Sequence, residues 1–314
     1  MKEIIRKNVA GIWSAMSTPF TEDLELDTKS VSRLVEHHVR LGIKGLFLGS
    51  HNGEGHLMTD SMRMELAAEV VKSNQDRMLL SMMIADNPAK LMIDNIKQAE
   101  DCGIDIAVIN FPFPPIGIEH KYLRELFMSV LEKSSLPIAL CHIGRASSLL
   151  SEIALLEELF LHPKVILVKD CSGNTIRTKL LVETFRKSGK KLITLAGNEF
   201  ECVSYAESGY DGFLLNSACF TGFIANVIFE FAQADRIKDA HEVQDYMNSI
   251  LIEIFGLDLD NYLVGQKQMM VELGIFNTAR TLQDEQIPDE CLKAIRKIAQ
   301  EEKEFLLPEI KTTK

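Results

Sequence analysis

The segment VILVKD (165–170) places four consecutive apolar residues directly before a lysine and an aspartate. A short run this apolar is typical of a strand buried on both faces, as strands in parallel sheets are. Because side chains alternate along a strand, Val165, Leu167 and Lys169 are expected to share one face. The segment therefore predicts an inner strand of a parallel sheet, with an amine near its carboxyl end.

Further apolar runs of the same kind occur along the chain. They begin at intervals of about 21 to 34 residues, and each interval has room for one strand, one helix and two loops. Together, such units predict an α/β fold, a closed (β/α)₈ TIM barrel. No GxGxxG motif follows the first run, which argues against an open dinucleotide-binding sheet. Besides 165–170, the runs are 11–17, 45–50, 78–84, 106–111, 137–142, 191–197 and 212–217.

The stretches between these runs carry helix signals. Residues 30–42 repeat apolar side chains at helical spacing and end at Gly42. Residues 59–73 begin with Thr59 and Asp60 as capping candidates. Residues 87–103 have a proline near their start and a glycine at their end, the usual asymmetry of helices. We therefore expect a helix after each of the first three strands.

The strand signals cease after residue 222, and the remaining residues are typical of helices. We expect a TIM barrel over residues 1–222. Over residues 223–314 we expect helices that complete the barrel, followed by a C-terminal helical region.

Composition excludes several classes of protein. A net charge of −11 would repel the phosphates of a nucleic acid, so we expect no nucleic-acid partner. We expect no membrane segment, because no apolar run approaches the required length, and no signal peptide at the N-terminus. The 6 cysteines form no CxxC pair and suggest no disulfide scaffold, which indicates a cytoplasmic protein.

Reactive groups of such barrels lie at the carboxyl ends of the strands. Lys169 is the strongest candidate, because a lysine in a confined and poorly hydrated place is favoured as the neutral amine that imine formation needs. A lysine whose ammonium reaches out to water is the alternative. Other strand ends carry Thr18, Ser50, His51, Asn52, Glu54, Cys141, His142, Asp170, Asn198, Glu199, Asn216 and Ser217.

Two of these groups suggest ligands. The segment GSHNGEG (49–55) offers backbone N–H groups before a helix and could hold a carboxylate, although a simple tight turn explains it equally. Cysteine and histidine at neighbouring strand ends could bind zinc, but their spacing matches no zinc motif, and we expect no metal ion. The residues of that alternative are His51, Cys141, His142 and Cys171.

Several segments resemble, in order and spacing, the dihydrodipicolinate synthase and N-acetylneuraminate lyase family of class I, Schiff-base-forming enzymes. Residues 165–174 are similar to the family's segment around the imine lysine. Residues 49–59 resemble its Gly-Thr-Thr-Gly-Glu loop with one residue extra. The segments are GIWSAMSTPF (11–20), GSHNGEGHLMT (49–59), VILVKDCSGN (165–174), LAGNE (195–199), GYDGFLL (209–215) and Gln266-Lys267.

This resemblance implies a TIM barrel with a C-terminal helical region, assembled as a homo-oligomer, a tetramer or a dimer. It implies that Lys169 attacks the C2 carbonyl of pyruvate or another 2-oxo acid, with no cofactor. Ser50, His51 and Asn52 would then bind the carboxylate of this small-molecule substrate. Leu214 would line the pocket near the imine.

The chain departs from the family where protons are transferred. The Tyr-Asn pair usual at the end of the fifth strand reads Cys141-His142, and the Pro-Tyr-Tyr after the fourth strand becomes 112–114, Pro-Phe-Pro. We therefore expect His142, Cys141 or His51 to transfer protons. Arg145, one place earlier than the family's arginine, would bind an acidic second substrate or the distal end of a sugar acid.

The sequence thus predicts a carbon–carbon, or carbon–oxygen, lyase of the class I aldolase type that acts on a 2-oxo acid. Three alternatives remain open. They are dihydrodipicolinate synthase proper with an altered proton relay, a catalytically silent family member that binds a 2-oxo acid, and a zinc-dependent enzyme.

Overall fold

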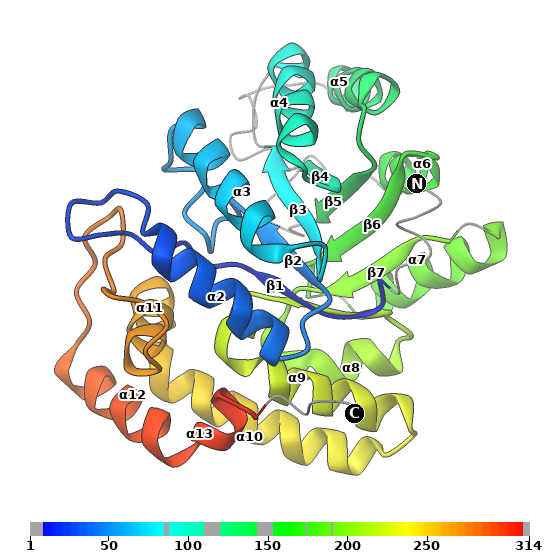
Figure 1. The fold of residues 1–314 in the computed structure, drawn as a ribbon. Coiled ribbons are helices and arrows are strands. Elements are labelled where there is room, and N and C mark those ends of the chain that lie inside the picture. The colour runs from blue at the N-terminus through cyan, green and yellow to red at the C-terminus, as the bar shows by residue number, and fades with distance from the viewer. Residues whose placement is uncertain are drawn as a thin grey trace.

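Parallel strands close into a barrel in chain order, with β8 returning to β1 (Figure 1). The computed structural model describes residues 9–84, 88–109, 120–142, 153–173, 175–189 and 191–309. Each predicted apolar run contains one strand, so the predicted TIM barrel is confirmed. The strands are β1 (Gly11–Ala15), β2 (Gly45–Leu48), β3 (Leu79–Ile84), β4 (Ile106–Ile109), β5 (Ile138–His142), β6 (Val165–Asp170), β7 (Ile193–Ala196) and β8 (Gly212–Leu215).

A helix follows each strand and covers the outside of the barrel, as the blue-to-green part of Figure 1 shows. A 3₁₀ turn at Glu199–Glu201 precedes the helix after β7. The helices are α2 (Thr28–Arg40), α3 (Asp60–Asn74), α4 (Ala89–Cys102), α5 (His120–Lys133), α6 (Ile153–Leu161), α7 (Thr175–Ser188), α8 (Cys202–Glu207) and α9 (Ala218–Gln233).

The first of these helices begin and end at residues that the sequence signals identify. Asp27 accepts a hydrogen bond from the backbone N–H of Ser30 and starts α2, two residues earlier than predicted. Of the two capping candidates, Thr59 caps α3 and the other is the first residue of the helix. Helix α4 begins after Pro88 and ends at Gly103, whose φ of +101° suits a glycine.

The remaining helices lie together at one side of the barrel (Figure 1). Helix α10 packs against α9, α12 packs against α10, and α11 packs against α12. Residue 222, where we expected the barrel to end, lies within α9, and the division of the chain there remains a prediction. No helix in the described ranges combines the length and the apolar character needed to cross a membrane. The helices of this region are α10 (Ile237–Phe255), α11 (Tyr262–Glu272), α12 (Asp289–Glu301) and α13 (Lys303–Leu306).

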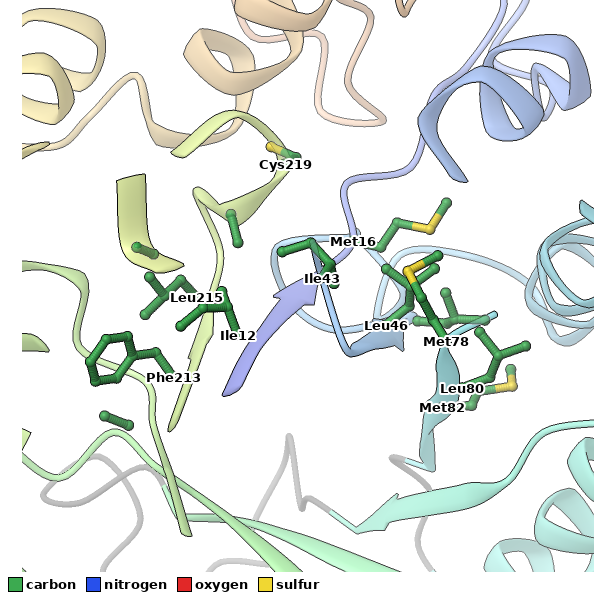
Figure 2. Close-up of a cluster of buried hydrophobic side chains, with 14 of the residues drawn as sticks. Ile12, Met16, Ile43, Leu46, Met78, Leu80, Met82, Phe213, Leu215 and Cys219 are labelled. Carbon is green, nitrogen blue, oxygen red and sulfur yellow. The ribbon is translucent and has the colours of Figure 1, made fainter. Parts of the chain in front are cut away.

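Two hydrophobic layers hold the barrel together. The outer layer joins strands to helices, and Figure 2 shows part of it, with Ile12, Leu46 and Phe213 among its side chains. The inner layer fills the barrel and includes Trp13, which is fully buried. A Cβ atom at Gly45 would come within 2.4 Å of the Trp13 ring, so the glycine makes room for the indole. The barrel interior is therefore packed, as is usual for this fold.

An irregularity in β6 sets the direction of its side chains. Ile138 of β5 pairs with Val165, but the next residue of β5 pairs with Leu167, so Ile166 is an extra residue. Val165 consequently belongs to the outer layer, whereas Leu167 belongs to the inner one. The predicted shared face was wrong for Val165, because a bulge interrupts the alternation.

Candidate active site

Lys169 lies at the carboxyl end of β6 and is only 5% exposed. Its Cα pairs with Cys141 of β5 and Leu195 of β7, which both belong to the inner layer. The Nζ atom lies 5.7 Å from the centre of the Phe47 ring. It donates a hydrogen bond to Oδ1 of Asn216 at 3.3 Å. The ammonium or amine of Lys169 is thus held inside the barrel, at the end where such folds bind substrates.

The partner of Lys169 is neutral. Among the described residues, no carboxylate forms an ion pair with its Nζ atom. The Nζ atom is thus positioned by an amide oxygen and lies near an aromatic ring, with no carboxylate bound to it among these residues.

A buried carboxylate positions Asn216 from behind. Glu199, at the end of β7, accepts hydrogen bonds from the backbone N–H groups of Asn216 at 3.1 Å and Ser217 at 3.0 Å. Tyr262 of α11 donates its hydroxyl proton to Glu199 at 2.7 Å. Burial and the neighbouring Glu199 charge raise the pKa of Tyr262 well above its usual value. Glu199 therefore links Tyr262, in the tail of the chain, to the backbone of Asn216, and the Asn216 side chain accepts a hydrogen bond from Lys169.

Asp170, the residue after the lysine, faces the other way. Tyr210 donates its hydroxyl proton to Oδ2 of Asp170, and the backbone N–H of Ser172 donates to Oδ1 at 2.8 Å. Asp170 therefore fixes the turn after β6 rather than forming an ion pair with the lysine.

Two thiols lie beside the lysine. Cys141 is 6% exposed, belongs to the inner layer and pairs with Lys169 across neighbouring strands. A Cβ atom at Gly197 of the neighbouring strand end would lie 2.2 Å from Sγ of Cys171 and 2.9 Å from Cε of Lys169. Gly197 therefore leaves the space in which the lysine stem and the Cys171 sulfur meet.

The loop after β2 is tied down by buried polar groups. Thr18 donates its hydroxyl proton to the Gly53 carbonyl at 2.7 Å, and the hydroxyl of Ser50 accepts from the Gly53 N–H at 3.2 Å. The Asn52 amide donates to the Ala15 carbonyl at 2.7 Å and accepts from Nε2 of Gln266 at 2.7 Å. The Asn52 side chain is therefore occupied by protein partners.

The backbone of the same loop is less occupied. The N–H groups of His51 and Asn52 donate to no other residue in the described ranges, whereas Glu54 and Gly55 donate back into the loop. The His51 ring is exposed at the rim, 5.0 Å from the His56 ring. Desolvation, followed by the charges of His56 and Lys169, lowers the pKa of His51. This imidazole is consequently neutral at pH 7 and can accept a proton.

A buried ion pair lies behind the loop. Glu54 and Lys267 of α11 are both fully buried and form a direct ion pair. Lys267 also donates to the Arg280 carbonyl at 2.8 Å, and Glu54 accepts from the Leu282 N–H at 2.6 Å. Burial lowers the pKa of Lys267 to about 8, against the opposing effect of Glu54. The pair joins the tail of the chain to the barrel mouth.

The structure brings some of the predicted site residues together and does not describe others. Lys169, Cys141 and the loop residues Ser50, His51 and Asn52 meet at one end of the barrel, and Leu214 is buried in the inner layer. Arg145 and the side chain of His142 lie outside the described residues. A metal site needs several ligands together, and no group of three or more His, Cys, Asp or Glu side chains suited to a metal occurs within the described ranges.

Sequence reasoning missed the groups that support the lysine. Asn216 and Glu199 were recognised only as strand-end residues, without a role. Gln266 lay in a segment that carried the resemblance, although its bond to the loop had no sequence signal. Tyr262 had no signal at all, because it reaches Glu199 only through tertiary packing.

Comparisons with known proteins agree with this geometry. The sequence model of the Dihydrodipicolinate synthetase family matches residues 8–283. The chain is similar to N-acetylneuraminate lyase from Rhizobium meliloti (strain 1021), with 23% identity over 265 residues, which are 84% of this chain and 86% of that protein.

Solved structures of low identity share the fold. N-acetylneuraminate lyase from Fusobacterium nucleatum, solved in complex with pyruvate, has a TM-score of 0.82 and 16% identity, covering 94% of this chain and 97% of its own. Dihydrodipicolinate synthase from Bacteroides thetaiotaomicron has a TM-score of 0.84 and 22% identity, covering 93% and 98%. The family match spans most of the residues that form the barrel and its tail, so this chain belongs to the dihydrodipicolinate synthetase family.

Proposed function

We propose that this protein is a Schiff-base-forming lyase in which Lys169 attacks the C2 carbonyl of pyruvate or another 2-oxo acid. The observation that carries the proposal is a buried lysine at the barrel mouth whose hydrogen-bond acceptor is the neutral Asn216 amide. The neutral amine adds to C2, and the adduct takes up a proton and loses water to leave an iminium. The iminium then accepts the electron pair of a bond that breaks at C3, which is how such enzymes cleave or form C–C bonds.

The loop after β2 is the proposed carboxylate site. Its support is the pair of N–H groups of His51 and Asn52, which have no acceptor among the described residues, and the nearby hydroxyl of Ser50. The Asn52 amide itself serves to hold the loop. Leu214 would form part of the apolar floor beneath the imine. The relative from Fusobacterium nucleatum, crystallised with pyruvate, supports a 2-oxo acid as ligand.

The second substrate follows from the proton-transfer groups. The hydroxyl relay usual in dihydrodipicolinate synthases is replaced, with Cys141 where the family carries a tyrosine. We therefore favour aldol cleavage or condensation over dihydrodipicolinate synthesis. His142 remains a proposed acid–base group, and Arg145 a proposed contact for an acidic or sugar-acid substrate. We further propose a homo-oligomer, a tetramer or a dimer, on the family resemblance, and a cytoplasmic location on the cysteine usage.

Borohydride trapping tests the proposal directly. Incubation with pyruvate and borohydride should add a reduced pyruvyl group to Lys169, detected by mass analysis of the peptide that contains it. Lys169→Met should abolish the adduct completely, because the other buried lysine at the mouth, Lys267, is fully buried and paired with Glu54. Lys164→Met is the matched control, since Lys164 lies at the opposite end of β6 and donates to the Ser134 carbonyl. This control should label like the wild type.

A wild-type protein that carries no label would contradict the proposal. Label on a lysine other than Lys169 would show that the nucleophile is that other lysine. Product formation separates the reactions that remain. N-acetylneuraminate cleavage, or aldol condensation of pyruvate with aldehydes, is expected. Conversion of pyruvate and aspartate semialdehyde to the cyclic product would instead establish dihydrodipicolinate synthesis.

A further inference from the structure

Helix α11 contacts the barrel mouth at two places that lie one helical turn apart. Tyr262 and Gln266 are four residues apart and therefore lie on the same side of the helix. The Tyr262 hydroxyl reaches Glu199, which follows β7, and the Gln266 amide reaches Asn52, which follows β2. Nε2 of Gln266 also donates to the Tyr262 carbonyl at 3.2 Å, within the helix. One side of α11 thus contacts both the lysine side and the loop side of the site.

On the lysine side, the contact ends at the backbone that carries Asn216. Helix α9 starts just after this residue, and the hydroxyl of Ser217, its N-cap residue, bonds to that of Thr221 at 2.9 Å rather than capping the helix. The Glu199 carboxylate takes that place and accepts from the backbone N–H groups of Asn216 and Ser217. A carboxylate at the N-terminus of a helix is also favoured by the helix dipole. Glu199 therefore fixes the start of α9 and the backbone of Asn216.

Tyr262 holds that carboxylate from α11. Its hydroxyl donates to Oε1 of Glu199 at 2.7 Å, and the centre of its ring lies 4.8 Å from that of Phe255. Oδ1 of Asn216 is, among the described residues, the only hydrogen-bond acceptor of Nζ of Lys169. Because the stem of a lysine is flexible, this contact orients the reactive nitrogen. The position of the nitrogen therefore depends on the hydroxyl of Tyr262.

On the loop side, the contact ends at the proposed carboxylate site. Gln266 is fully buried, and its Nε2 donates to Oδ1 of Asn52 at 2.7 Å. The Asn52 amide donates to the Ala15 carbonyl at 2.7 Å, which ties the loop to β1, and more weakly to the Asn216 carbonyl at 3.2 Å. The backbone N–H groups of Asn52 and His51 are the proposed ligands of the substrate carboxylate. A shift of the Asn52 side chain therefore moves chiefly the groups that bind the substrate.

We propose that α11 positions both halves of this site through two different residues. Tyr262 is the positioning residue of the nucleophile and acts through Glu199 and Asn216. Gln266 is the positioning residue of the carboxylate loop and acts through Asn52. This inference rests on the proposed Schiff base. It adds that the maximal rate of imine formation and the affinity for the 2-oxo acid depend on separate side chains of one helix.

The kinetics of imine formation separate the two roles. The imine formed after set times is trapped with borohydride, and its rate constant is measured against pyruvate concentration. Tyr262→Phe keeps the ring and removes the hydroxyl, so the maximal rate constant should fall about tenfold, within the roughly 100-fold that a misplacement of about 1 Å costs. The half-saturating pyruvate concentration should not change. Gln266→Met should instead raise that concentration about tenfold, as expected when one hydrogen bond that holds a binding group is lost, and should leave the maximal rate constant nearly unchanged.

Tyr246→Phe is the matched control for the loss of the hydroxyl. Tyr246 of α10 also donates its hydroxyl proton to a glutamate, Glu302, and its ring packs against Phe305 of α13. This control should leave both kinetic parameters unchanged. The fraction of protein labelled at the end of the reaction should match the wild type in every variant. A variant that only loses folded protein would lower this fraction and leave the rate constant as it is.

Two further variants test the path of each contact. Tyr262→Phe added to Asn216→Ala should react no more slowly than Asn216→Ala alone, because the hydroxyl acts through the side chain that is already removed. Asn52→Ala removes the partner of Gln266 from the loop and should also raise the half-saturating pyruvate concentration. The loop side of the test therefore holds even if Gln266→Met folds poorly.

The outcomes separate the two proposals. An adduct on Lys169 whose kinetics are unchanged in Tyr262→Phe or in Gln266→Met overturns the role of that residue and leaves the Schiff base standing. A change of the same parameter in both variants, or a Tyr246→Phe protein that behaves like Tyr262→Phe, also overturns the inference. Further slowing by Tyr262→Phe in the Asn216→Ala protein overturns the path through Asn216. A wild type without any adduct overturns the Schiff base, and the positioning roles fall with it.

Discussion

Two buried lysines of this barrel have opposite surroundings. Lys267 is fully buried, forms an ion pair with Glu54 and lies 4.3 Å from the centre of the Phe20 ring. Lys169 is 5% exposed, donates to the Asn216 amide and forms no ion pair in the described part of the chain. Lys267 is paired with a carboxylate and has no exposed surface. Lys169 keeps a small exposed surface and has no carboxylate partner among the described residues.

This difference shows that burial alone does not identify a nucleophile. A carboxylate partner compensates a buried ammonium and makes it a structural group, because removal of either partner leaves the other unpaired. A neutral acceptor positions the amine without stabilising its charge to the same degree. In this protein, the hydrogen-bond partner of a buried lysine therefore distinguishes the structural lysine, Lys267, from the proposed nucleophile, Lys169.

Loss of the structural lysine should cause the largest effect on stability. Lys267→Met leaves Glu54 buried without its partner and should lower the free energy of unfolding by about 3–5 kcal/mol, measured by chemical denaturation. Lys297→Met removes the exposed pair with Glu301 and should cost less than about 1 kcal/mol. Equal losses in the two variants would break the distinction between the buried and the exposed pair.

Filling the space beside the reactive lysine should mainly lower activity. In Gly197→Ala, the new Cβ would lie 2.2 Å from the Cys171 sulfur and 2.9 Å from Cε of Lys169. Displacing either group by about 1 Å should slow formation of the trapped adduct about 100-fold. Gly274→Ala is the control, since its φ of +73° strains an alanine while nothing lies within 4 Å. This control should lose stability and keep its labelling rate, and parallel behaviour of both variants would refute the steric argument.

Giving the reactive lysine a carboxylate should make it resemble the structural one. Asn216→Asp places a charged acceptor where Nζ of Lys169 now meets an amide oxygen at 3.3 Å. The carboxylate favours the ammonium form, so imine formation at pH 7 should slow about tenfold and recover at higher pH. The measurement is the rate of borohydride-trapped adduct against pH. An unchanged profile would show that the neutral partner is irrelevant to reactivity.

The barrel itself could be predicted because its strands are buried on both faces. Such strands appear as continuous apolar runs, and Val165 to Val168 is a clear example that also places Lys169 at a strand end. The bulge at Ile166 could not be predicted, since one extra residue leaves no mark in an apolar run. The sequence left open whether Lys169 points inward or out to water, and the face it assigned to Val165 was wrong.

The surroundings of the lysine depend on contacts that no local pattern encodes. Tyr262 and Gln266 meet the barrel mouth only after the tail packs against it. The sulfur of Cys171 has room beside the lysine stem because Gly197 lacks a side chain. The family resemblance identified the position of Cys141, whereas the nearness of Cys171 to the lysine followed only from the three-dimensional arrangement.

The ion pair between the β2 loop and the tail also constrains how the chain is synthesised. Glu54 emerges from the ribosome early, and its counter-ion Lys267 emerges only when most of the chain has been made. Until then, a fully dehydrated mouth would enclose an unpaired carboxylate, which is strongly unfavourable. We therefore expect the loop to stay hydrated, or its carboxylate to stay protonated, until α11 is made, so that the mouth is completed late in folding. A polypeptide that stops short of the tail is then expected to lack a finished site.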